Sequence, residues 1–158
     1  MKIIYCKKWS VFRKQPHDII TEQEAKRRHE KNGPYTAVIY NSKDDTVRFV
    51  VDVNSRFIVV NFFNEELENY LMYGFVKIEG KLFINTAYYY RFLDNKEIEH
   101  IYFNFKENGD MVTEKKDYIK DIVEESESKV DVSGNWLSIP EFGNYKEILI
   151  EQRIDLLM

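Results

Sequence analysis

Alternation between apolar and polar positions, with the period of two that is typical of β-strands, dominates the chain from residue 35 onward. Three runs rich in β-branched and aromatic residues, 35–40, 46–53 and 57–63, are separated by the polar stretches 41–45 and 54–56. β-Branched and aromatic side chains fit the pleated surface of a strand, whereas Asn, Asp and Ser tolerate turns. These runs predict an antiparallel meander.

The next segment, residues 64–73, allows two interpretations. Its apolar residues fit a short helix, but they also fit an alternation that leads into the following strand. We favour a strand over about 70–78, because a turn at Glu79 and Gly80 then leads directly into the apolar run 81–84.

Two more strands are expected on either side of Asn108 and Gly109. Residues 98–105 alternate before this pair, and residues 111–116 can pair back after it. Asn-Gly is the strongest two-residue hairpin signal, because both central positions of a type I′ turn need positive φ. The pattern thus predicts a twisted antiparallel sheet of about six to seven strands.

A helix is expected at each end of this sheet. Thr21 and Glu24 fit a capping box, in which each side chain satisfies a free amide of the first turn, and Gly33 followed by Pro34 ends the helix. The last segment, 144–158, predicts a closing helix. Its apolar residues at near-helical spacing are Ile148, Leu149, Ile150 and Leu156.

The predicted fold class is therefore α+β, in a single domain over residues 1–158. A chain of this length can bury a core in one domain, and no repeat or Pro, Gly or Ser tract marks a boundary. Apolar residues make up 44% of the chain, which argues against disorder. The lone Cys6 cannot form an intramolecular disulfide, so the fold depends on packing.

Apolar runs in the chain are too short for a membrane protein. None approaches the roughly 20 residues that cross a bilayer. The apolar stretch near Met1 is shorter than the roughly 7–15 residues of a signal-peptide core. We therefore expect a cytoplasmic protein without a membrane partner.

Charge is unevenly distributed along the chain. The formal net charge is −4, yet residues 1–32 carry nine Lys or Arg against four Asp or Glu, so the remainder carries −9. An acidic surface repels nucleic acid and attracts a basic protein. We expect the acidic segment 121–131 to be an exposed loop that attracts such a partner, with nearby aromatic residues either contacting the partner or packing on the sheet. The candidate partner-binding residues are Asp121, Glu124, Glu125, Glu127, Asp131, Trp136, Phe142 and Tyr145.

Side chains suited to catalysis are scarce, because the chain has three histidines and one cysteine. His29 is expected on a solvated helix, His100 on the surface and His17 in a loop. Cys6 is expected in the core rather than paired with His17 as a nucleophile. The histidines lack the spacing of metal ligands on a helix, and glycine-rich phosphate loops are absent. We predict a protein that is not an enzyme, with no catalytic residue, metal site or cofactor.

The amino-terminal region supports an alternative function in RNA binding or processing, because aromatic rings beside cations can hold a single strand. These residues are Tyr5, Lys7, Lys8, Trp9, Phe12, Arg13, Lys14, Lys26, Arg27 and Arg28. The acidic remainder makes nucleic acid an unfavourable partner. A structural or self-associating β-protein is a third possibility.

Several segments together resemble a known class of proteins. They are 70–75, 80–83, 101–105, 108–109, 135–136 and 140–145. As a set they resemble small immunity proteins of bacterial contact-dependent growth inhibition and related polymorphic-toxin systems. The resemblance implies a cytoplasmic protein that binds and blocks the toxic carboxy-terminal domain of a delivered effector, often a nuclease with a basic cleft.

Overall fold

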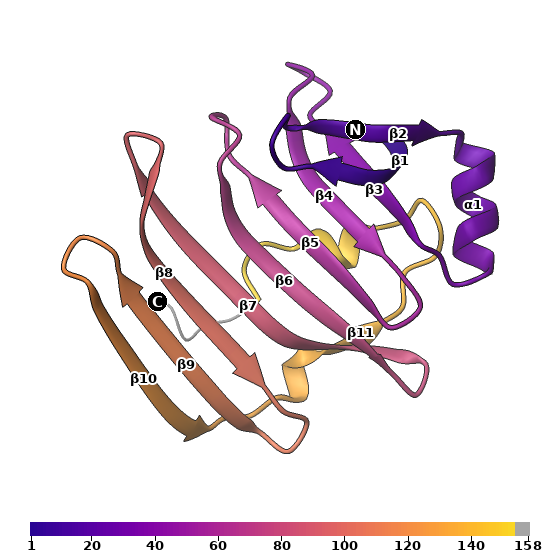
Figure 1. Cartoon of the computed structure of the whole chain (residues 1–158). Helices are drawn as coiled ribbons and strands as arrows, with labels where there is room; N and C mark the ends of the chain where they lie inside the picture. The colour runs from indigo at the N-terminus through magenta and orange to yellow at the C-terminus, as the bar shows by residue number, and fades with distance from the viewer. Residues whose placement is uncertain (154–158) are drawn as a thin grey trace.

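The computed structural model describes residues 1–153, which form one antiparallel sheet of eleven strands with one α-helix and two 3-10 helices (Figure 1). The strands are β1 (Lys2–Ser10), β2 (Gln15–Ile20), β3 (Tyr35–Tyr40), β4 (Val47–Val53), β5 (Phe57–Phe63), β6 (Asn69–Ile78), β7 (Lys81–Leu93), β8 (Lys96–Phe105), β9 (Asp110–Asp117), β10 (Ile122–Lys129) and β11 (Trp136–Ser138). The helices are α1 (Glu22–Glu30), η1 (Ser133–Asn135) and η2 (Lys146–Leu149).

The strands follow the order β10-β9-β8-β7-β6-β5-β4-β3-β1-β2 across the sheet. From β3 to β10 each strand pairs with its neighbour in the chain, so the predicted antiparallel meander is confirmed. The ambiguous segment 64–73 is a short loop followed by strand from Asn69, as favoured. β11 pairs with the first residues of β7, where Trp136 lies opposite Phe83.

One face of the sheet, called here the covered face, holds the main core. A cross-strand row on this face runs through Ala37, Val51, Val60, Tyr73, Ala87 and Phe103, all of them buried. The carboxy-terminal segment crosses behind this face in Figure 1, and the Phe142 ring stacks on Tyr5 at 5.1 Å. The opposite face is called the open face, because no described segment crosses it over β7–β10 (Figure 1).

The predicted amino-terminal helix is confirmed as α1. The Thr21 hydroxyl accepts a hydrogen bond from the Glu24 amide at 3.0 Å, and Ala25 is buried in the core. Gly33, with φ +78°, follows the end of the helix, in the left-handed region that favours glycine.

The predicted carboxy-terminal helix is wrong for the described part of segment 144–158. Only η2 is helical there, and Leu156 lies outside the described residues. Tyr145 and Ile148 are both buried, and their spacing of three residues suits a single 3-10 turn. The segment then crosses the sheet, where the Tyr73 hydroxyl donates to the carbonyl of Glu151. The molecule is therefore nearly all β, instead of α+β with two helices.

The turn at Asn108 and Gly109 also differs from the expected type I′ turn. The amide of Gly109 donates to the carbonyl of Lys106 at 3.0 Å, and only Gly109 has positive φ, at +93°. This is the three-residue loop with a glycine bulge. The approach of Val130 accounts for the glycine, because a Cβ on Gly109 would lie 2.6 Å from the Val130 carbonyl oxygen.

Strands were missed at both edges of the sheet. β2 contains His17, which was expected in a loop, and β10 contains most of the acidic segment 121–131. Every side chain of β10 is exposed, so one face is not distinguished from the other by hydrophobicity. The total of eleven strands thus exceeds the six to seven expected.

Candidate partner-binding face

The acidic segment forms the edge strand β10 and its flanking turns rather than a loop. Asp121 lies in the turn before the strand, with φ +53°. Glu124, Glu125 and Glu127 lie within the strand. Asp131 follows it and accepts a hydrogen bond from the amide of Ser133 at 2.9 Å. All five acidic residues are exposed, and the strand fixes the directions of the three that lie within it.

Pairing with β9 separates these carboxylates between the two faces. Glu124 lies opposite Lys115, whereas Glu125 lies opposite Glu114. Successive side chains of a strand point to opposite faces. Glu125 and Glu127 therefore share the open face with Glu114, and Glu124 projects from the other face.

A cross-strand row connects these carboxylates to aromatic side chains on the open face. Tyr88 on β7 lies opposite Tyr102 on β8, and Tyr102 lies opposite Glu114 on β9. The rings of Tyr88 and Tyr102 are 4.5 Å apart. Tyr90 stacks on Tyr88 at 5.5 Å with an interplanar angle of 3°. The tyrosine rings therefore form a platform beside an acidic strip.

His100 links this platform to the acidic strip. Its Nε2 lies 3.0 Å from Glu114 Oε1, and its Nδ1 lies 2.9 Å from the Tyr118 hydroxyl oxygen. A carboxylate can only accept, so Nε2–H donates to Glu114. Only 11% of the His100 side chain is exposed, so His100 lies on the open face, as expected, but is largely covered by its neighbours. Glu97 adds a second carboxylate 3.6 Å from Nδ1.

Burial raises the pKa of two tyrosines on this face. Desolvation raises the pKa of Tyr90 to about 12, and the pKa of Tyr88 is raised by desolvation and by the nearby Tyr102 and Glu114. Both shifts move the pKa further above neutral pH, so both hydroxyls stay uncharged at physiological pH, as an unperturbed tyrosine does. The platform therefore offers uncharged aromatic rings next to the carboxylate of Glu114.

The aromatic residues proposed as partner contacts engage the core instead of joining the acidic strip. Trp136 packs on Phe83 with ring centroids 4.8 Å apart. Phe142 packs on Tyr5, and Tyr145, which is 3% exposed, has its hydroxyl oxygen 3.0 Å from that of Tyr35. The structure thus does not bring these three rings together with the acidic residues. A partner role for them stays a prediction.

Sequence reasoning missed the tyrosines of the open face. Their residue type alone did not distinguish these tyrosines from ordinary strand residues, because aromatic side chains are common in strands. They are Tyr88, Tyr90 and Tyr102. A signal was present in the alternation of 98–105, where Tyr102 shares its face with the polar His100 and Asn104 instead of the apolar set.

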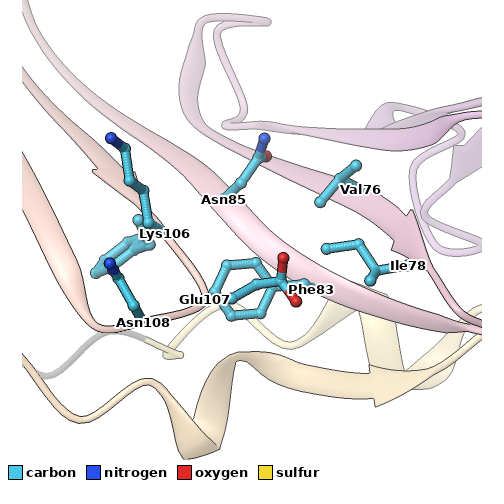
Figure 2. A pocket seen from close by; sticks show the side chains of 8 residues that line it. Val76, Ile78, Phe83, Asn85, Lys106, Glu107 and Asn108 are labelled. Atoms are coloured by element: carbon cyan, nitrogen blue, oxygen red, sulfur yellow. The ribbon is translucent and has the colours of Figure 1, made fainter.

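Two hollows lie near this face. One, of about 440 Å³, is lined by Val76, Ile78 and Phe83 together with residues of the β8–β9 turn, including Lys106 and Glu107 (Figure 2). The side chains of Lys106 and Glu107 are exposed, so this hollow is wide and does not gather polar groups around one point.

The second hollow, of about 280 Å³, is lined by the rings of Trp9, Phe63 and Phe92, with Asn61 among its polar groups. Asn61 lies in the same cross-strand row as Met72 and the tyrosine platform. The hollow therefore extends the open face toward the amino-terminal hairpin.

Groups suited to nucleophilic or metal chemistry are not assembled around this face. Cys6 is fully buried, and desolvation raises the pKa of its thiol to about 11, so it is almost entirely protonated at neutral pH. It is a core residue, as expected. The side chain of His17 is about half exposed and lies 3.5 Å from Asp18. Within residues 1–153, no three His, Cys, Asp or Glu side chains are placed to hold a metal ion.

Comparisons with known proteins do not identify a relative: no family model, no curated protein and no solved structure matches the chain. Over the part of the chain that is described, no helix has the length and apolar character needed to span a bilayer.

Proposed function

We propose that this chain is a toxin-neutralising immunity protein, which binds and blocks the toxic carboxy-terminal domain of a delivered bacterial effector in the cytoplasm. The observation that carries the proposal is the acidic, tyrosine-bearing open face. Glu114, Glu125 and Glu127 project from it beside the tyrosine platform. Tyrosine is enriched at the energetic centres of interfaces, and complementary charge speeds encounter.

A nuclease domain is the partner that this face suits best. Such a domain must hold a polyanion and therefore carries a basic cleft. An acidic surface placed in that cleft occupies the position of the phosphate backbone. The protein acts by binding and needs no turnover or cofactor for this role.

RNA binding through the amino-terminal region is the alternative, and the open face does not favour it. Arg27 Nη2 lies 2.7 Å from Glu24 Oε1, and Arg28 Nε lies 3.1 Å from the same oxygen. Hydrogen bonds from these arginines hold the pKa of Glu24 at about 2. Within the helix, Glu24 therefore neutralises part of the positive charge of Arg27 and Arg28. On the open face, the carboxylates beside the tyrosines repel phosphates.

Binding kinetics test the proposal, with the carboxy-terminal domain of a large secreted protein encoded beside this chain's gene as the partner. Glu125→Lys should slow association at low salt by about tenfold, weaken its salt dependence and speed dissociation. Glu124→Lys changes the net charge equally from the other face, so it is the matched control and should have a smaller effect on association and none on dissociation.

Equal rates for the two variants would place the docking surface elsewhere. Absence of binding by the unaltered protein, together with no protection of cells that express the toxic domain, would refute the immunity function.

A further inference from the structure

The chemistry of the open face indicates which group of a partner it would hold. In the cross-strand row of Tyr88, Tyr102, Glu114 and Glu125, two aromatic rings are followed by two carboxylates on four adjacent strands. Neighbouring strands in a sheet are about 4.8 Å apart. A flat cation lying on the rings therefore reaches the carboxylates without leaving the face.

We infer that this row binds the guanidinium group of an arginine side chain presented by the partner. The inference rests on the proposed function and gives it a chemical anchor. A guanidinium can stack on a tyrosine ring, where the negative π face attracts it, and can donate hydrogen bonds from its edge to carboxylate oxygens.

The register places two carboxylates at directly opposite positions of β9 and β10 on the open face. Glu114 and Glu125 are directly opposite each other, an arrangement that is destabilising for like charges. His100 donates to Glu114 Oε1. A guanidinium at this position would relieve the repulsion between Glu114 and Glu125.

Cations of β9 and β10 that share the face lie outside this row. Lys129 lies two positions beyond Glu127 on β10, and its Nζ is 3.1 Å from Asp110 Oδ1. Lys116 lies in the next row on the other side. Lys116 is opposite His100, and its Nζ lies 4.8 Å from the centre of the Tyr118 ring. That contact occupies the Lys116 ammonium at the end of the platform away from Glu127.

Arginine suits this row better than lysine. An ammonium is compact and strongly hydrated, so it gains from the carboxylates but little from the rings. A guanidinium is planar and weakly hydrated, and it can use both at once. Arginine is also enriched in protein interfaces, whereas lysine is depleted.

The test uses the full chain with labelled tyrosine rings and follows their resonances by NMR during titration with the tripeptide Gly-Arg-Gly. Saturable shifts of the Tyr88 and Tyr102 rings are expected, and Gly-Lys-Gly should bind more weakly. The peptide with citrulline, the neutral isostere of arginine, should give no saturable shift. The Glu114→Gln, Glu125→Gln double variant should weaken arginine binding by about tenfold, while Glu124→Gln should leave it unchanged.

Equal shifts with citrulline and arginine, or unchanged binding by the double variant, would overturn the inference. So would shifts produced by a single-stranded oligoribonucleotide in place of the arginine peptide. Arginine binding without any toxin binding would support the cation site and refute the immunity function. Toxin binding without an arginine response would refute the cation site alone.

Discussion

Glu125 on β10 lies directly opposite Glu114 on β9, so two carboxylates face each other on the open side of the sheet. The next position along β10 has the opposite arrangement, with Glu124 across from Lys115. By register, one strand therefore places like charges opposite each other on one face and opposite charges opposite each other on the other face, where Lys115 Nζ also lies 3.9 Å from Glu99 Oε1.

Neutralising the repulsive pair should stabilise the free protein. Glu125→Gln is expected to raise the free energy of unfolding by about 0.2–1 kcal/mol, the usual contribution of a cross-strand pair. Glu124→Gln removes an attractive pair and should lower it or leave it unchanged. Urea unfolding at low salt measures both variants, and added salt should reduce the difference by screening. A loss of stability in Glu125→Gln would contradict the repulsion.

Gly109 should be far less replaceable than Gly80, although both have positive φ. Gly80→Ala should cost about 1–2 kcal/mol for the left-handed conformation alone, because no atom lies within 4 Å of the added Cβ. Gly109→Ala also places a Cβ against the Val130 carbonyl oxygen, so we expect a loss of at least about 3 kcal/mol. Denaturant unfolding of both variants checks the order, and equal losses would contradict the close approach.

Tyr145 should contribute to stability through its hydroxyl as well as its ring. The Tyr35 hydroxyl oxygen lies 3.0 Å from that of Tyr145 and 2.8 Å from His29 Nδ1, so the three groups form a chain of hydrogen bonds under the carboxy-terminal segment. Tyr145→Phe should lower the free energy of unfolding by about 1 kcal/mol, since Tyr35 keeps one partner. Tyr90→Phe removes a hydroxyl from the open face and serves as the control. Equal melting temperatures for Tyr145→Phe and the unaltered protein would refute this role.

His29 should make the protein less stable in mild acid. Burial, reinforced by the nearby charge of Lys77, lowers the pKa of His29 in the folded state below the value of about 6.5 expected in the unfolded chain. The unfolded state therefore binds more protons in this range. Stability from His29 is complete above about pH 6.5 and is lost as the pH falls toward the folded-state pKa.

His29→Gln should remove that part of the pH dependence. The comparison is the slope of unfolding free energy against pH between about 7.5 and 5 for the two proteins. A parallel slope in the variant would assign the acid sensitivity to other groups. The slope is the relevant measurement, because the substitution also removes the ring contact between His29 and Phe142.

The predicted strands 35–40 and 57–63 coincide with β3 and β5, and the predicted helix start at Thr21 is correct. These elements could be predicted from the sequence because their signals are local. A strand with distinct faces or apolar enrichment carries its pattern in its own residues, and the cap formed by the Thr21 hydroxyl and the Glu24 amide lies within four residues. The hairpin at Glu79 and Gly80 was readable for the same reason, and both residues have positive φ there. The reciprocal half of the predicted capping box does not form, because the Glu24 carboxylate accepts from Arg27 and Arg28.

Elements whose position depends on residues far away in the sequence could not be predicted from their own residues. β2 and β10 are edge strands with little buried surface, so no alternation distinguishes their faces. The loop at Gly109 packs against Val130, which follows β10, two strands further along the chain. The path of segment 144–153 depends on the core into which Tyr145 and Ile148 are buried.

The sequence by itself determined an antiparallel sheet, an acidic segment that stays exposed and a buried Cys6. Only the tertiary structure decided that Glu125 faces Glu114 and the tyrosine platform, while Glu124 faces away and Tyr145 lies in the core. The reason is the register between strands: a shift of one residue would exchange the two faces of β10, and that register comes from pairing with β9 rather than from the acidic residues themselves.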